Sequence, residues 1–412
     1  MPPAPNIRQC LAHWACSHNV THAALSDLLK LLKVLGLDVP LTAASLLKSP
    51  RNVEVQHKSG GDYINFGLAK SISSCLSTVP PDVVQSLEEI KLQINIDGLP
   101  LFKSSSMSVW PILCSFSDDM QLRSKPFPVA MFCGPKKPSN LDFLLDFVDE
   151  SKMLYNDGLI FNERRISIKI ICVICDAPAK AFVKGTVQFN GKYGCDRCVQ
   201  KGEYSEGRML FLHADAPSRT DDSFRRQENS EHHKHRSPFC DLYLDMINDF
   251  PIDYMHLVNL GVTKRLMLAW ICGPLKSQLS SSQIDTISMN LLKLQSYMPK
   301  EFARRPRSLQ YVRMWKATEF RQFLVYTGPI VLRKVLTDEY YVNFLSLSCA
   351  VSILLNSTLT AEHKDYADQL LKFFVHSSAQ LHGQNFVTYN VHALTHLCEV
   401  AERYGCLEKC SA

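Results

Sequence analysis

The sequence predicts an α/β fold in which a mixed sheet is followed by a long, mainly helical insertion. Residues 170–175 are uncharged and apolar, the pattern of a strand buried on both faces. Residues 91–96 alternate apolar and polar side chains, as a half-buried strand does. Between them lie two further strand-like segments and one amphipathic helix, whereas helical patterns dominate after about residue 200.

Composition sets the limits of this prediction. The chain has 412 residues, enough for two or three domains, and its formal charge of +5 is compatible with a nucleic-acid partner. Its 15 cysteines are scattered and no signal peptide precedes them, which indicates a reducing intracellular compartment. The uncharged stretch 340–361 is interrupted by serines and asparagines, so we expect a buried helix there and no membrane span.

Residues 1–85 are predicted to form an N-terminal helical region. Thr21 can cap a helix that Gly36 can end. One face of this helix is apolar and carries Leu25, Leu28, Leu29, Leu32 and Leu35. Core packing is the simplest use of such a face, and docking on DNA or dimerisation is the alternative.

Residues 86–200 are predicted to form the sheet. Strand patterns at 108–116 and 127–134 follow the first strand, and a helix at 141–158 precedes the buried strand. Three strands in succession, a helix and a central strand are typical of a sheet of the ribonuclease H kind. In such a sheet the first and fourth strands lie side by side.

Each of these two neighbouring strands ends on an aspartate, Asp97 and Asp176. If the strands are adjacent, the two carboxylates approach each other and need a cation to share the site. Oxygen ligands of this kind suit Mg²⁺ or Mn²⁺. Asp176 has a second interpretation that stays open, because it could cap a helix beginning at Ala177.

A second candidate site combines Cys195 and Cys198, spaced as CxxC, with His392 and His396, four residues apart on one helical face. Two thiolates and two imidazoles make a closed tetrahedral site for structural Zn²⁺. The two pairs lie much farther apart in sequence than in a zinc finger. A redox-active or simply buried CxxC is therefore the alternative.

An ordered set of motifs carries a resemblance to a known family. The sequence resembles the transposase-derived proteins related to CACTA-type (En/Spm) elements and, more distantly, the catalytic subunit of the V(D)J recombinase. The likeness extends over nearly the whole chain and is strongest from 91 to 270. The motifs are Ile96-Asp97-Gly98-Leu99-Pro100, Val109-Trp110-Pro111-Ile112, Ile174-Cys175-Asp176-Ala177-Pro178-Ala179, Gly194-Cys195-Asp196-Arg197-Cys198 and Phe250-Pro251-Ile252-Asp253-Tyr254-Met255-His256-Leu257.

The resemblance implies a DDE transposase with a ribonuclease H-like core, a helical insertion at 201–385 and a return to the core at 386–412. It also implies that Asp97 and Asp176 are the first two catalytic carboxylates and metal ligands. By the same resemblance, the zinc ligands are Cys195, Cys198, His392 and His396.

Asp253 and His256 match a (C/D)xxH signature of the same superfamily. The alternative is structural: Asp253 could cap a helix over 254–270, and His256 could be a core histidine with its hydrogen bonds satisfied.

The family's third carboxylate is a glutamate on a helix shortly after the zinc histidines. This chain stops at Ala412, sixteen residues past His396, and the glutamates of its tail sit in no recognisable motif. Glu319 is an internal alternative. We therefore expect an incomplete triad. The tail glutamates are Glu399, Glu402 and Glu408.

The predicted function follows from this set. In complete form the site would cleave and transfer DNA strands by two-metal chemistry, and as given we expect the chain to be inactive. A domesticated, non-catalytic DNA- or chromatin-binding protein is the alternative; a nuclease for RNA–DNA hybrids is disfavoured by the long insertion. We expect the protein to be nuclear, to bind DNA and not to be associated with a membrane, and a homo-oligomer is compatible with the sequence.

Several basic side chains could contact DNA phosphates, although surface solubility explains an isolated run of arginines equally well. These residues are Lys264, Arg265, Arg304, Arg305 and Arg307.

Overall fold

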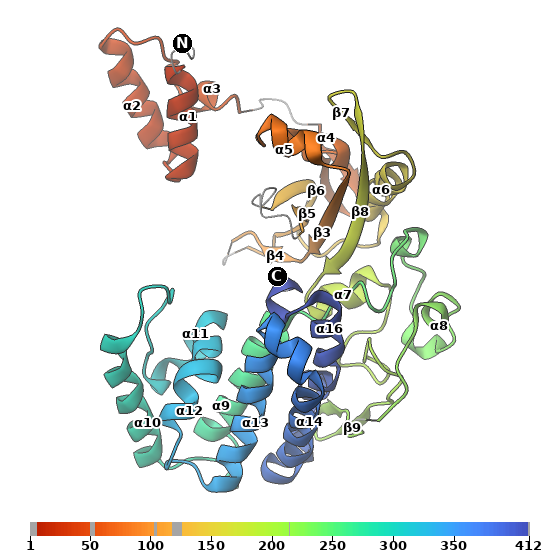
Figure 1. Cartoon of the computed structure of the whole chain (residues 1–412), viewed down its shortest axis with the longest axis vertical. Coiled ribbons are helices and arrows are strands. Elements are labelled where there is room, and N and C mark those ends of the chain that lie inside the picture. The colour runs from red at the N-terminus through yellow and green to blue at the C-terminus, as the bar shows by residue number, and fades with distance from the viewer. Residues whose placement is uncertain (1–5, 50–53, 103–104, 118–125, 214, 411–412) are drawn as a thin grey trace. The chain divides into compact units, whose positions relative to one another are not determined.

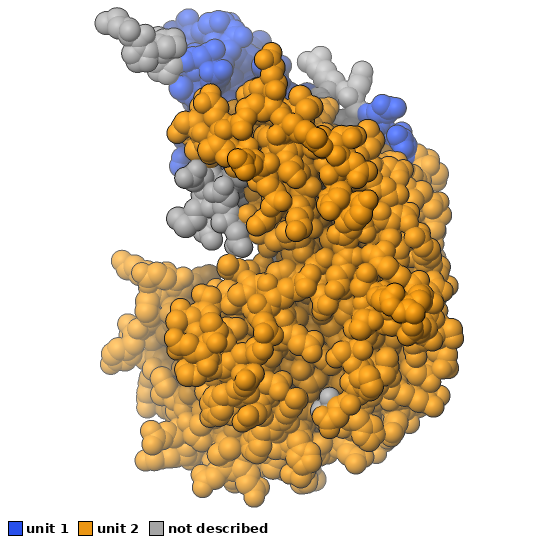
Figure 2. Space-filling view, turned by 45° about the vertical axis from the view of Figure 1, so that its right-hand side comes forward, with its two compact units in different colours: residues 1–56 blue, residues 57–412 orange. Residues whose placement is uncertain are grey.

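The computed structural model describes residues 6–49, 54–102, 105–117, 126–213 and 215–410. The chain divides into two compact units, residues 1–56 and 57–412 (Figure 2). About half of the described residues are helical and the rest include a mixed sheet, so the predicted α/β class is confirmed.

The first unit consists of α1 (Ile7–Ser17), α2 (His22–Val34) and α3 (Ala43–Leu46). Thr21 caps α2 by accepting a hydrogen bond from the Ala24 amide at 3.2 Å, as predicted. Leu25 and Leu29 are buried in a small core, whereas Leu35 is 76% exposed. The predicted apolar face is thus only partly used for packing within this unit.

The second unit is built on one large sheet, whose strand order is β1-β2-β6-β5-β3-β8-β7, with β4 paired to β5. Residues 57–85 belong with this sheet because β2 pairs with β6. The strand patterns at 108–116 and 127–134 coincide with β5 and β6. The strands are β1 (Gln56–Lys58), β2 (Gly61–Asn65), β3 (Glu89–Ile96), β4 (Leu99–Pro100), β5 (Ser108–Phe116), β6 (Phe127–Gly134), β7 (Leu159–Phe161) and β8 (Arg164–Ile174).

The central feature of the sheet is the parallel pair of β3 and β8. The neighbouring pairs β3–β5, β5–β6, β2–β6 and β7–β8 are antiparallel, so the sheet is mixed. The register sets Asn95 opposite Ile174, so both strands end at the same edge. The predicted adjacency of these two strands is confirmed, with α6 (Leu145–Asp157) in the connection between them.

The insertion begins with irregular chain and becomes helical from residue 255 onward (Figure 1). A hairpin of β9 (Glu203–Ser205) and β10 (Arg208–Leu210) interrupts the irregular part. The remaining α-helices are α4 (Leu68–Leu76), α5 (Pro81–Ser86), α7 (Ala177–Val183), α8 (Asp221–Arg225), α9 (Lys264–Cys272), α10 (Ser281–Leu294), α11 (Ala317–Gln322), α12 (Gly328–Val331), α13 (Asp338–Leu354), α14 (Ser357–His382), α15 (Tyr389–His392) and α16 (Leu397–Tyr404).

Short 3₁₀ and π segments complete the second unit. Two of them are π-helical, namely η4 (Met255–Thr263) and η7 (Phe323–Thr327). The 3₁₀ turns are η1 (Asp142–Leu144), η2 (Ser230–His232), η3 (Pro238–Asp241), η5 (Gln295–Tyr297), η6 (Leu309–Met314), η8 (Gln384–Phe386), η9 (Ala393–His396) and η10 (Leu407–Cys410).

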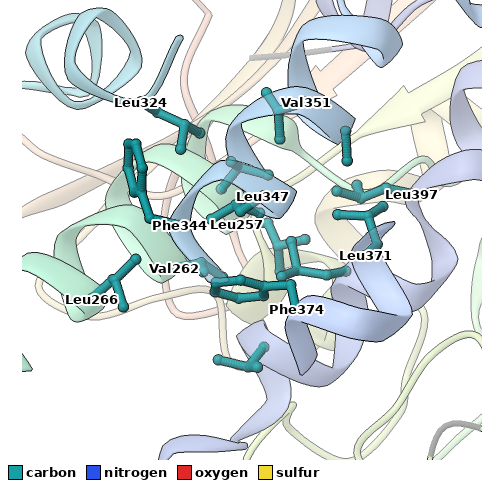
Figure 3. Packing of buried hydrophobic residues seen from close by; sticks show 14 of the residues in the cluster. Leu257, Val262, Leu266, Leu324, Phe344, Leu347, Val351, Leu371, Phe374 and Leu397 are labelled. Atoms are coloured by element: carbon teal, nitrogen blue, oxygen red, sulfur yellow. The ribbon is translucent and has the colours of Figure 1, made fainter. Parts of the chain in front are cut away.

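Two hydrophobic cores hold this unit together. One lies at the sheet, and the other is formed by the helices of the insertion, where Phe344, Leu347 and Phe374 are fully buried (Figure 3). The apolar stretch at 340–361 is not one helix, because α13 ends before Asn356 caps α14. Among the helices in the described part of the chain, none is long and apolar enough to cross a membrane.

The segment that follows the zinc-ligand candidates returns to the sheet. Tyr404 of α16 donates a hydrogen bond to the Asn248 carbonyl at 3.0 Å. The Gln93 side chain of β3 donates to the Lys409 carbonyl at 3.0 Å. These contacts fix the end of the described chain against strand β3.

Candidate functional site: a cysteine–histidine centre beside an aspartate pair

The two predicted cysteines and the two predicted histidines converge on one buried site. Their ligand atoms all lie within 4.8 Å of one another. Cys195, Cys198 and His392 are at most 1% exposed, and His396 is 6% exposed. The convergence that the sequence predicted is confirmed, and the group can bind a structural metal such as zinc.

Four of the six separations among the ligand atoms are close to the edges of a zinc tetrahedron. The two sulfurs are 3.5 Å apart, and the two Nε2 atoms are 3.4 Å apart. The sulfur–nitrogen separations are 3.3 Å for Cys198–His392 and 3.7 Å for Cys195–His396. Zn–S and Zn–N bonds of about 2.3 and 2.0 Å, arranged tetrahedrally, require edges of about 3.3–3.8 Å. All four separations fall in that range.

Local structure explains why these side chains meet. The CxxC follows Gly194, where an added Cβ would lie 2.5 Å from the Gln188 carbonyl oxygen, so the turn needs a glycine. Arg219 then fixes the turn by donating from Nε to the Cys195 carbonyl at 3.1 Å. His392 ends α15 and His396 ends the 3₁₀ turn η9 that follows it.

The two predicted aspartates emerge at the same edge of the sheet: Asp97 directly follows β3, and Asp176 follows β8 after Cys175. Both side chains are half-buried. Burial raises the pKa of Asp97, and the carboxylate of Asp176 raises it further. Both aspartates therefore lie at the ends of adjacent parallel strands, and the approach of their carboxylates stays a prediction.

Asp97 is held by the turn that follows it. Its Oδ1 accepts a hydrogen bond from the Gly98 amide at 2.7 Å. An added Cβ on Gly98 would lie 2.7 Å from the Trp110 ring, so only glycine lets the turn lie against that ring. Trp110 in turn packs edge-on against Phe182 of α7, with ring centroids 5.4 Å apart.

Asp176 fulfils the structural interpretation that the sequence left open. It caps α7, because its Oδ1 accepts from the Ala179 amide at 2.7 Å. Capping occupies one oxygen of the carboxylate. The second oxygen has no hydrogen bond to the described residues, so capping and cation binding are compatible.

Asp253 and His256 join this group. Asp253 is 4% exposed; its Oδ1 accepts from the Met255 amide at 2.9 Å, and its Oδ2 is hydrogen-bonded to His256 Nδ1. The hydrogen bond to Asp253 raises the pKa of His256, which also senses Asp176 and Asp97. The capping alternative for Asp253 therefore holds. His256 is not a core histidine, because its side chain is 36% exposed.

A pocket of about 140 Å³ is lined by Asp176, Asp253 and His256, and Asp97 lies outside its lining. Its polar lining comes from three elements that are far apart in sequence, namely α7, η4 with its preceding loop, and α15. α15 also carries His392, so the cysteine–histidine centre and the pocket share a supporting helix. The polar side chains of the lining are Asp176, Lys180, Asp253, His256, Tyr389 and Asn390.

Buried charges link the pocket to the cysteine–histidine centre. Lys180 Nζ lies 3.3 Å from Asp196 Oδ2 and donates to the Pro251 carbonyl at 2.7 Å. Tyr389 donates to Asp196 Oδ1 at 2.9 Å. Burial would raise the pKa of Asp196, but Lys180, Lys184 and Arg197 outweigh it and hold that pKa well below its usual range.

Lys184 is the least satisfied member of this cluster. Its side chain is fully buried, and its Nζ has no hydrogen-bond partner among the described residues. The ammonium instead lies 4.9 Å from the ring centroid of Phe224 and 5.5 Å from that of Phe250. Burial lowers the pKa of Lys184 to about 7.

The candidate third carboxylates are engaged elsewhere. Glu319 is buried and pairs with Arg307 through both oxygens, at 2.6 and 2.9 Å. Glu402 pairs with Lys364 at 2.7 Å. Glu408 pairs with Arg321, and Glu399 is exposed on α16. Arg307 is therefore bound to a buried carboxylate, whereas Arg304 and Arg305 are exposed.

Sequence reasoning missed the buried ion cluster. Lys180 follows Asp176 by four residues, one helical turn, and this spacing could have placed both on one face of α7. No sequence signal marked Tyr389, whose role depends on the fold.

Comparison with known proteins adds no neighbour to this description. No protein-family model matches the sequence, and no curated protein is significantly similar to it. The chemistry of the described residues therefore carries the functional inference.

Proposed function

We propose that the chain is a transposase-derived DNA-binding protein with a ribonuclease H-like core, in which Asp97 and Asp176 hold a divalent cation. One observation carries the proposal: two aspartates lie just past the ends of the adjacent parallel strands β3 and β8. The partial strand order β6-β5-β3-β8 supports it, because it sets the first and fourth strands of the core side by side. A DNA partner further implies a nuclear protein.

The residues around the pair fit a cation and a phosphate. Mg²⁺ or Mn²⁺ held by Asp97 and Asp176 would supply Lewis-acid stabilisation of a phosphodiester oxygen. His256, whose pKa is raised by Asp253, can carry a proton on Nε2 toward such an oxygen. Lys180 also lines the pocket, with its ammonium paired to Asp196.

We propose that the cysteine–histidine centre holds Zn²⁺ as a structural ion. Its four ligands come from the two ends of the insertion, and α15 then passes to the pocket. The zinc would fix the walls of the pocket and take no part in its chemistry.

We expect DNA binding without cleavage at a transposase-like rate. Glu319, Glu402 and Glu408 are held in ion pairs. Asp253 lines the same pocket as Asp176, but both its oxygens accept hydrogen bonds, from Met255 and from His256. Without a third carboxylate the site should lose orders of magnitude in rate.

The test combines DNA binding with nicking of a supercoiled plasmid in Mg²⁺ and in Mn²⁺, using residues 1–412 and the variants Asp97→Asn and Asp176→Asn. We expect all three proteins to bind DNA and none to nick it above background. A chain that does not bind DNA would overturn the proposal. Robust nicking that both variants abolish would instead classify the protein as an enzyme, with Asp253 as the first candidate for its third ligand.

A further inference from the structure

A second, larger pocket of about 480 Å³ lies where η4 and α9 meet η8 and the end of α14. Volumes of this size are typical of ligand sites. No aspartate or glutamate lines it among the residues that the structure describes. We call it the Arg208–Arg265 pocket. The side chains that define its chemistry are Arg208, Lys264, Arg265, His382, Phe386 and Asn390.

The three cations of this pocket lack a counter-charge. Within the described chain, Arg208, Lys264 and Arg265 form no ion pair. Arg265 donates from Nη2 to the Asn385 carbonyl at 2.7 Å, and its guanidinium lies 5.0 Å from the Phe386 ring centroid. Its buried Nε has no hydrogen-bond partner in that part of the chain. Burial and then Arg208 lower the pKa of Arg265 to about 10, so the pocket is short of negative charge.

His382 does not supply this charge. It stacks on Phe386 with ring centroids 4.6 Å apart, and neither ring nitrogen has a partner among the described residues. Burial, followed by Arg265 and Lys276, lowers its pKa to about 4, so the imidazole is neutral at physiological pH. An anion is therefore the ligand that the pocket favours.

The pocket shares one lining residue with the pocket of Asp176 and His256. Asn390 lines both pockets. An added Cβ on Gly261 would lie 2.7 Å from Asn390 Nδ2, so the glycine lets α15 pack closely on η4. η4 and α9 then run from His256 in one pocket to Lys264 in the other. At an α-helical rise, eight residues span about 12 Å, or roughly three to four steps of a nucleic-acid strand.

We propose that the Arg208–Arg265 pocket binds backbone phosphates of a nucleic-acid strand that continues from the Asp176–His256 pocket. This inference rests on the proposed DNA-binding function and adds the path of the strand. The shared chemistry is a phosphate ester, and a free phosphorylated molecule is the other source of it. The shared residue Asn390, and the run of η4 and α9 from one pocket to the other, favour the strand.

The test measures binding of a fluorescein-labelled DNA duplex to the full chain by anisotropy over a range of salt concentrations. The variants are Arg208→Gln and Lys264→Gln, because neither side chain makes a hydrogen bond within the described chain. Lys293→Gln, at an exposed position of α10, is the charge-matched control. Each pocket variant should weaken binding about three- to tenfold, and each should reduce the slope of log K against log salt by about 0.9.

The outcomes separate this proposal from the proposed function. If the duplex binds and both pocket variants behave like Lys293→Gln, the strand path is wrong while DNA binding stands. If the unchanged protein does not bind the duplex, both proposals fall. In a second arm, pyrophosphate binding is measured by calorimetry. Pyrophosphate binding that the two variants weaken, together with unchanged duplex binding, would assign the pocket to a free phosphorylated molecule and overturn the strand.

Discussion

The cysteine–histidine centre and the aspartate pair share α15 as a support but differ in how their polar groups are satisfied. The four sulfur and nitrogen ligands are buried and lie within 4.8 Å of one another. Asp97 and Asp176 are half-buried like charges that raise the pKa of Asp97. A closed ligand set stabilises a fold, whereas a half-buried carboxylate with a raised pKa and an oxygen to spare is available for a ligand. The two sites should therefore respond oppositely to mutation.

The largest effect should come from breaking the closed site. Cys198→Ser or His392→Ala should abolish stoichiometric zinc and lower the free energy of unfolding by more than about 4 kcal/mol, because metal binding contributes to folding. Denaturant unfolding and metal analysis of the purified protein check this. Cys272→Ser, at an exposed cysteine, is the control. Equal stability of the His392→Ala variant and the unchanged protein would contradict a structural metal.

The second-largest loss of stability should come from breaking the buried ion cluster of Lys180, Asp196 and Arg197. Asp196→Asn leaves Lys180 and Arg197 buried without their carboxylate. Breaking a buried pair in this way costs about 3–5 kcal/mol. Urea unfolding measures the loss, with the exposed Asp285→Asn as the control. A loss no greater than that of the control would show that the cluster is not a stabilising link.

Lys184 should make stability depend on pH. Its pKa is about 7 in the folded chain and 10.5 ordinarily, so the unfolded chain binds more protons between these values. The free energy of unfolding should therefore rise with pH from about 7 to 10.5. Lys184→Met should remove that rise and should be the more stable form below pH 7. Denaturant unfolding of both proteins from pH 7 to pH 10.5 measures this pH dependence of the free energy of unfolding. If the two free energies change with pH in parallel, Lys184 is not the cause.

The smallest effect on stability should be at the aspartate pair. Asp97 has a raised pKa, so the folded chain loses stability from this group as pH rises through that pKa. Asp97→Asn should then leave the metal-free protein as stable at neutral pH or more stable by up to about 1 kcal/mol. Thermal unfolding without divalent cations, against Asp285→Asn, tests this. A large loss would mean that Asp97 serves the fold.

The residues of both sites could largely be predicted from the sequence, because both sites depend on local sequence patterns. Strand alternation and a terminal aspartate located Asp97, and two short spacings located the cysteine–histidine centre. The bounds of β5 and β6 followed from apolar segments ended by polar or glycine-rich turns.

The rest could not be predicted because it depends on contacts between distant segments. The ion pair of Arg307 with the buried Glu319 forms only once the insertion is packed, so neither residue's role was visible in the sequence. The pairing of β2 with β6 likewise draws residues 57–85 into the sheet. The long apolar stretch was divided by Asn356, whose side chain caps α14.

The central claim is that Asp97 and Asp176 hold one divalent cation together. The direct measurement is a Mn²⁺ titration of the metal-analysed, zinc-loaded protein, with free Mn²⁺ followed by electron paramagnetic resonance. The unchanged protein should bind Mn²⁺, and Asp97→Asn and Asp176→Asn should each weaken that binding by at least about tenfold, since each removes a ligand. Asp285→Asn should leave it unchanged. Absence of Mn²⁺ binding, or binding that neither substitution alters, would contradict the account.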